Sequence, residues 1–131
     1  MTGSAGGGMA TDREIENFIR DCFASIWDLE VLRELLEVPS GSITAEDLVE
    51  RMRASELVVL QGSSALSAAG IAVIEDGGRI RFQPSSDAIG DLARAACEFY
   101  ARFPGRVRRL IVSRQNPALD AFADAFRLRK D

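Results

Sequence analysis

Four arginines stand in two close pairs, where their guanidinium groups can bind phosphate. Arg79 and Arg81 alternate in the stretch RIRF, so in a β-strand both side chains lie on one face. Arg51 and Arg53 end the helix-like stretch EDLVERMR. A guanidinium binds phosphate oxygens with a fixed fork of donors, so this chemistry favours a polyanionic partner. The alternative is that they are ordinary surface arginines, or that Arg51 and Arg53 oppose a helix dipole.

The stretch expected to be a helix between these pairs, residues 55–69, carries no cation. Its one charged side chain is Glu56. Helical periodicity puts one set of its side chains on an outer face: Leu57, Leu60, Gln61, Ser64 and Ala68. Gln61 can pair with adenine, Ser64 with base edges or a phosphate, and Leu57 with thymine methyl groups. The electrostatic attraction that dominates DNA affinity must therefore come from outside this helix.

The residues of catalysis and metal binding are scarce in this chain. It contains no histidine and two cysteines, Cys22 and Cys97, which we interpret as packed thiols in a reducing cytoplasm. A disulfide or redox switch is the alternative. There is no GxGxxG, Walker-type loop or nucleophile elbow. We therefore expect no enzyme, no cofactor and no metal site. No apolar run approaches the roughly 18 residues of a membrane span, so we also expect no membrane insertion.

Charge is distributed unevenly along the chain, although the formal net charge is only −4. Residues 1–90 hold 7 Arg and 15 Asp or Glu, whereas residues 91–131 hold 9 Lys or Arg and 5 Asp or Glu. An acidic total argues against binding nucleic acid over the whole surface. The later cations form a second candidate patch, in which helical spacing puts Arg102, Arg106 and Arg109 on one face; its members are Arg102, Arg106, Arg108, Arg109 and Arg114. The alternatives are a solvated face or pairing with the acidic half, within one chain or across a dimer.

The elements that must position these residues indicate a mostly α protein with a small β-hairpin, an α+β fold. Residues 1–10 are expected to be a disordered leader, and 11–131 a single domain. We expect a helix-turn-helix over about 26–70, a hairpin or wing over about 71–84, and C-terminal helices over 86–131. The glycine-rich DGGR predicts a two-residue primed turn between the strands. Gly62 inside its helix predicts the close approach of a neighbouring helix.

Two stretches, ITAEDLVERMRASELVVL and ALSAAGIAVIEDGGRIRF, resemble the winged helix-turn-helix of MarR- and ArsR-type bacterial transcription regulators. The AAGI junction followed by a turn is similar to their passage from reading helix to wing. The resemblance covers about residues 26–84. It implies a cytoplasmic homodimer that binds double-stranded DNA. Carried over residue by residue, the DNA-binding positions are Arg51, Arg53, Ser55, Leu57, Gln61, Ser64, Arg79 and Arg81.

Three functions remain open from the sequence. The first is a DNA-binding transcription regulator that reads DNA with helix 55–69 and the wing arginines. The alternative is a winged-helix protein–protein interaction module that does not bind DNA and presents Leu57 and Leu60 to a protein partner. A small-ligand sensor would use a cleft between the long flanking helices.

Overall fold

The computed structural model describes residues 10–115. Helix α2 (Asp12–Cys22) leads into α3 (Ile26–Glu37), and a short strand β1 (Ser42–Thr44) precedes α4 (Ala45–Met52) and α5 (Glu56–Ala68). The hairpin of β2 (Ala72–Ile74) and β3 (Arg79–Phe82) follows, and α6 (Asp87–Arg102) and α7 (Pro104–Gln115) complete the described chain. The predicted mostly α fold with a small β element is confirmed. The expected leader and the helix beyond residue 115 lie outside the described residues, except for Ala10.

Helices α2 to α6 each begin at a side chain that caps free amide groups of the first turn. Thr11 and Glu14 form a capping box at α2, and Ser25 and Asp28 form another at α3. The hydroxyls of Thr44, Ser55 and Ser86 accept hydrogen bonds from amides in the first turns of α4, α5 and α6. Such caps stabilise a helix end by about 1 kcal/mol each.

The sheet has three antiparallel strands in the order β1-β3-β2, and not the two of the predicted hairpin. Ile43 of β1 lies opposite Ile80 of β3, and Ile80 is in turn opposite Ile74 of β2. Strand β1 was missed in the sequence because it is three residues long and directly precedes a helix cap, Thr44. We define the wing as residues 72–82. Through its pairing with β3, strand β1 joins the segment between α3 and α4 to the wing.

The predicted two-residue turn of the wing is also wrong. Residues 75–78 connect the strands: Asp76 begins a 3₁₀ turn, and Gly77 and Gly78 follow with φ of 84° and 83°. The amide of Glu75 donates to the carbonyl of Arg79 over 2.7 Å and closes the loop. Glycine adopts a left-handed backbone conformation at little cost, so Gly77 and Gly78 allow a loop wider than the predicted two-residue turn.

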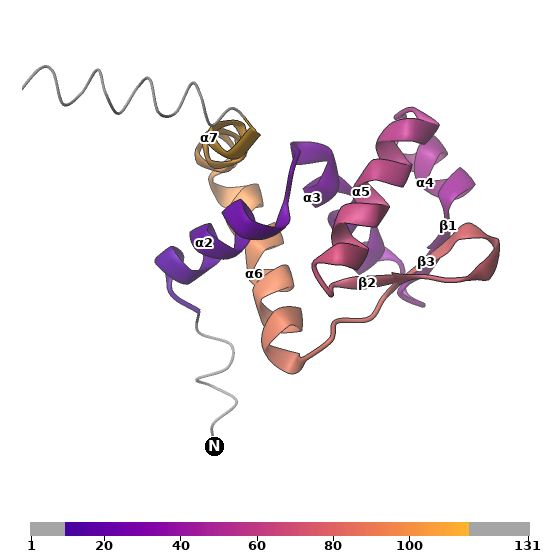
Figure 1. The fold of residues 1–131 in the computed structure, drawn as a ribbon, viewed down its shortest axis with the longest axis horizontal. Coiled ribbons are helices and arrows are strands. Elements are labelled where there is room, and N and C mark those ends of the chain that lie inside the picture. Colours follow the sequence, from indigo (N-terminus) through magenta and orange to yellow (C-terminus); the bar gives the residue numbers. More distant parts are fainter. Residues whose placement is uncertain (1–9, 116–131) are drawn as a thin grey trace, which may run out of the picture.

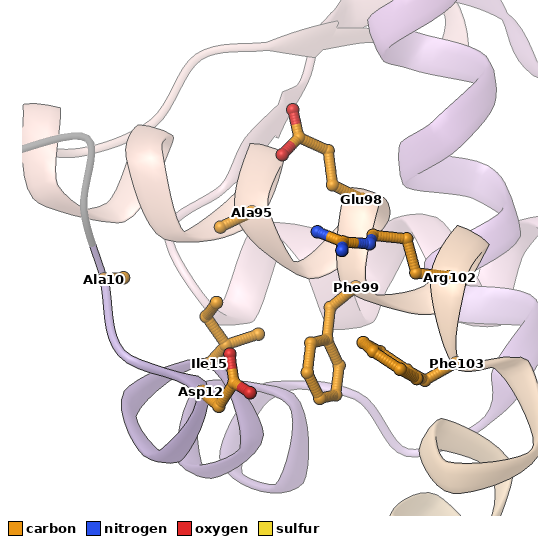
Figure 2. Close-up of a pocket in the computed structure, with 8 residues that line it drawn as sticks. All are labelled: Ala10, Asp12, Ile15, Ala95, Glu98, Phe99, Arg102 and Phe103. Carbon is orange, nitrogen blue, oxygen red and sulfur yellow. The ribbon is translucent and has the colours of Figure 1, made fainter.

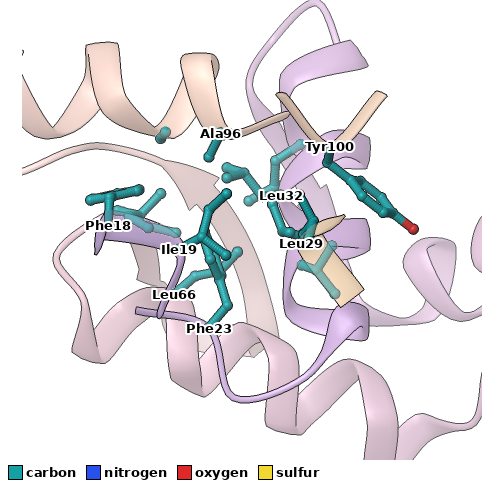
Figure 3. Close-up of a cluster of buried hydrophobic side chains, with 14 of the residues drawn as sticks. Phe18, Ile19, Phe23, Leu29, Leu32, Leu66, Ala96 and Tyr100 are labelled. Atoms are coloured by element: carbon teal, nitrogen blue, oxygen red, sulfur yellow. The ribbon is translucent and has the colours of Figure 1, made fainter. Parts of the chain in front are cut away.

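Apolar side chains of α2, α3, α5 and α6 meet in one core (Figure 3). Phe18, Ile19 and Phe23 lie against residues of the other helices, Leu66 of α5 among them. Figure 1 shows α2, α6 and α7 on one side of α3, and α4, α5 and the sheet on the other. The molecule thus has a flanking-helix end and a helix-turn-helix end, joined by α3.

Candidate nucleic-acid interface

The turn between α4 and α5 is short and well defined. Residues 53–55 connect the two helices, and Arg53 takes a left-handed backbone conformation with φ of 53°. The amide of Ala54 donates to the carbonyl of Val49, and the Ser55 hydroxyl accepts from the amide of Val58 over 3.1 Å. Two helices joined by so tight a turn form a helix-turn-helix. Ser55 therefore fixes the start of α5.

Helix α5 buries one face and leaves the other in solvent. The buried residues are Val59, Gly62, Ser63 and Leu66. The Ser63 hydroxyl is satisfied within the helix, because it donates to the carbonyl of Val59 over 2.7 Å. All five predicted outer residues are exposed: Leu57, Leu60, Gln61, Ser64 and Ala68. The division of α5 into two faces by helical period is confirmed.

Gly62 lies where α5 meets α3. A Cβ atom there would stand 2.9 Å from Cγ2 of Val31 and 3.5 Å from Oδ1 of Asp28. The predicted close approach of a neighbouring helix is confirmed. It presses α5 against the capped start of α3 and thereby holds the outer face of α5 in a fixed direction.

The two wing arginines have different partners. Nε of Arg81 donates to Glu75 across the wing over 2.9 Å. Nη1 of Arg79 donates to the Ser42 hydroxyl of β1 over 3.3 Å. Strand register puts both side chains on the sheet face opposite that of Ile80, as expected. Arg81 therefore has a carboxylate partner in its own chain, whereas Arg79 has a neutral one.

The arginines at the end of α4 also differ. Nε of Arg51 donates to Glu34 of α3 over 2.7 Å, and its Nη2 lies 3.8 Å from Glu37. Arg53 is exposed, and among residues 10–115 no carboxylate lies within ion-pair distance of it or of Arg79. The sequence reasoning missed Glu34, Glu37 and Glu75 as partners. Glu75 could have been found from the hairpin: with the correct loop length, Glu75 and Arg81 fall on the same face of the two paired strands.

The C-terminal cations do not form the single helical face that their spacing predicts. Phe103 has a non-helical backbone, so Arg102 ends α6 while the others lie in α7. Arg106 forms an ion pair with Glu16 of α2 and lies over the ring of Phe99. Arg108 and Arg109 are exposed. Arg114 lies in the last turn of α7.

A hollow of about 260 Å³ lies between α2 and α6 (Figure 2). Ile15, Phe99 and Phe103 give it apolar walls, and Asp12, Glu98 and Arg102 bring charged groups. Phe103 is 40% exposed here. Helices α2 and α6, which line the hollow, lie at the flanking-helix end, on the other side of α3 from α5 and the wing (Figure 1).

Thiols, acidic side chains and apolar helices are the remaining features of the described part of the chain. Cys22 and Cys97 are not joined in a disulfide. Across residues 10–115, no group of three or more histidine, cysteine or acidic residues is placed to hold a metal ion. No helix within this range is long and apolar enough to cross a membrane.

The chain matches no protein-family model, no curated protein and no solved structure.

Proposed function

We propose that the protein is a DNA-binding transcription regulator of the winged helix-turn-helix kind, similar to the MarR and ArsR regulators of bacteria. One observation carries the proposal: α5 is held by its inner face against α3 and α4, and its whole outer face is free. A helix presented in this way, with a hairpin after it, is the arrangement that enters the major groove. Gln61 and Ser64 are the side chains of this face that can read base edges.

Phosphate contacts come from the arginines that no carboxylate holds. Arg53 and Arg79 supply two such contacts in each subunit. Four contacts in a two-fold dimer give a slope of about −3.6 for log K against log salt. If Arg51 and Arg81 also exchange their carboxylates for phosphates, the slope approaches about −7. We therefore expect DNA binding of moderate strength, with a salt slope between these two values.

The regulator acts in the cytoplasm as a homodimer. The helix-turn-helix end and the flanking-helix end lie on opposite sides of α3 (Figure 1). Two copies joined through α2, α6 and α7 leave both α5 helices free. They can then meet two half-sites about one DNA turn apart.

Fluorescence anisotropy of a labelled 30-base-pair duplex, titrated at several salt concentrations, tests the proposal. Changing both Arg53 and Arg79 to Gln should weaken binding roughly tenfold at low salt and flatten the salt slope. The matched control changes Arg13 and Arg20 of α2, which are exposed at the other end of the molecule, to Gln. The control has the same net charge and should bind like the wild type. Wild-type protein without salt-sensitive binding at low salt would refute the proposal.

A second candidate function is a winged-helix interaction module that binds another protein. It is favoured by the exposed apolar side chains of α5, since Leu57 is 63% and Leu60 50% exposed. Exposed aliphatic residues one helical turn apart suit an apolar surface of a partner better than a phosphate backbone.

This alternative has its own test. A partner that co-purifies from the native host and is then reconstituted from purified components should lose binding to a Leu57→Asp variant. The control is Ala88→Asp, since Ala88 is exposed in the first turn of α6 and lies outside the α5 face. Equal binding of the partner to both variants would exclude the α5 face as its site.

A further inference from the structure

Glu75 lies on the wing beside the two arginines that face a polyanion in the proposed function. Its amide donates to the carbonyl of Arg79, so the two residues are opposite each other where the strands end. Successive side chains of a strand point to opposite faces of the sheet, and directly paired residues share a face. Glu75 therefore shares a face with Arg79 and Arg81 and is diagonal to Arg81.

The carboxylate of Glu75 occupies the donor that a phosphate would use. Its Oε2 accepts from Nε of Arg81 over 2.9 Å, a charge-assisted hydrogen bond. Carboxylate and phosphate oxygens present similar acceptor geometry to a guanidinium group. The two compete for Arg81.

The competition is close, because the ion pair is at the surface. The side chains of Arg81 and Glu75 are 41% and 36% exposed, and exposed ion pairs are weak. A phosphate can therefore displace the carboxylate. After displacement the negative charge of Glu75 remains on the wing and repels the backbone that Arg81 has bound.

We propose that Glu75 sets the affinity of the wing for DNA by competing with phosphate for Arg81. This inference rests on the proposed function. It gives Glu75 a specificity role as well, because a wing with weak phosphate binding lowers affinity for all sequences alike. The share of binding energy that depends on base contacts from α5 then rises.

The neighbouring Asp76 provides a matched control. It is exposed in the same loop, and its carboxylate has no ion pair with the described residues. Glu75→Gln and Asp76→Asn both remove one negative charge from the wing and keep the size of the side chain. Only Glu75→Gln releases Arg81.

Anisotropy titrations with the same 30-base-pair duplex compare wild type, Glu75→Gln, Asp76→Asn and the double variant Glu75→Gln/Arg81→Gln. We expect Glu75→Gln to bind roughly fivefold more tightly at low salt and to steepen the salt slope by about 0.9 per wing. Asp76→Asn should change the slope by less than half of that value. The double variant should lose both effects. Thermal unfolding of each variant checks that the wing is intact.

The possible outcomes separate this inference from the proposed function. If wild-type protein binds DNA and Glu75→Gln has the same affinity and slope as Asp76→Asn, Glu75 does not compete for Arg81, and the proposed function stands. If neither wild type nor any variant binds DNA, the proposed function itself fails. A gain in Glu75→Gln that persists when Arg81 is also changed would likewise overturn the competition.

Discussion

Arg51 and Arg81 carry the same charge as Arg53 and Arg79, yet their surroundings give them different chemistry. Glu34 and Glu75 hold the first two in ion pairs, whereas Arg53 projects from a left-handed turn position and Arg79 reaches a serine. A phosphate gains most from a guanidinium that no other anion occupies. Residue type and spacing in the sequence identified the candidate arginines. They did not identify the carboxylates, because Glu34 and Arg51 meet only through the packing of α3 against α4.

Cys97 gives a prediction for alkaline pH. Burial is the main cause that raises the pKa of its thiol from 9.0 to about 12; Glu30 and Glu98 add to the rise and Arg33 opposes it. The unfolded chain therefore loses this proton at lower pH than the folded protein does. The contribution of the buried Cys97 thiol to stability is complete below pH 9 and is lost as pH rises toward 12. Over this range the unfolding free energy falls by up to about 1.4 kcal/mol per pH unit.

The change Cys97→Ala removes this titration. Urea unfolding between pH 8 and 10.5 should show a flatter decline of the unfolding free energy in the variant than in the wild type. Tyr100 contributes to the decline that remains, because burial, followed by its hydrogen bond to Glu30, also raises its pKa. Equal slopes for variant and wild type would show that Cys97 is not shielded in the folded state.

Helices α2 to α6 were predictable from the sequence because their signals are local. Caps such as Ser55 and Ser86 and the breaks at Pro39 and Pro104 act over a few residues. Strand β1 and the wing loop were not predictable, since β1 is defined by pairing with β3, far along the chain. Likewise, the α5 outer face followed from helical period, whereas the exposure of Phe103 depended on where α6 ends.

Gly62 sets the distance between α3 and α5 and gives a prediction at the level of these elements. In an open helix, alanine is more stable than glycine by about 1 kcal/mol. Here the added methyl would meet Val31 at 2.9 Å, and overpacking of this kind costs about 1–3 kcal/mol. We therefore expect Gly62→Ala to lower the unfolding free energy, measured by urea titration, by about 1 kcal/mol. It should also weaken the proposed DNA binding by displacing α5.

Gly105 in the first turn of α7 is the matched control. A Cβ atom there would stand 3.7 Å from a guanidinium nitrogen of Arg109, an ordinary contact with a flexible side chain. Gly105→Ala should therefore leave the unfolding free energy from a urea titration unchanged or raise it slightly. If Gly62→Ala were as stable as Gly105→Ala, the packing of α3 on α5 would be looser than the distances indicate.

At the scale of the whole molecule, acidic and basic groups separate between two helices of the flanking-helix end, α2 and α7. Helix α7 carries Arg106, Arg108, Arg109 and Arg114 and no acid, whereas α2 carries Asp12, Glu14, Glu16 and Asp21. Arg106 and Glu16 already pair within one chain. In the proposed complex, a straight duplex at α5 and the wing would lie away from α7, which is at the other end of the molecule (Figure 1), so these cations would be available for another contact. Together with the exposed Phe103 and Val112, they suit α2 of a second copy.

If the proposed homodimer forms through this face, the double change Phe103→Glu/Val112→Glu should separate it. Acidic side chains placed at an apolar contact should weaken dimerisation by at least about tenfold. Light scattering coupled to size-exclusion chromatography measures the mass, and Leu57→Glu, at the other end of the molecule, should remain a dimer. The monomeric variant should also show half the salt slope of the wild type, because each duplex then meets one α5 and one wing instead of two. A dimer mass retained in the double variant would place the interface elsewhere.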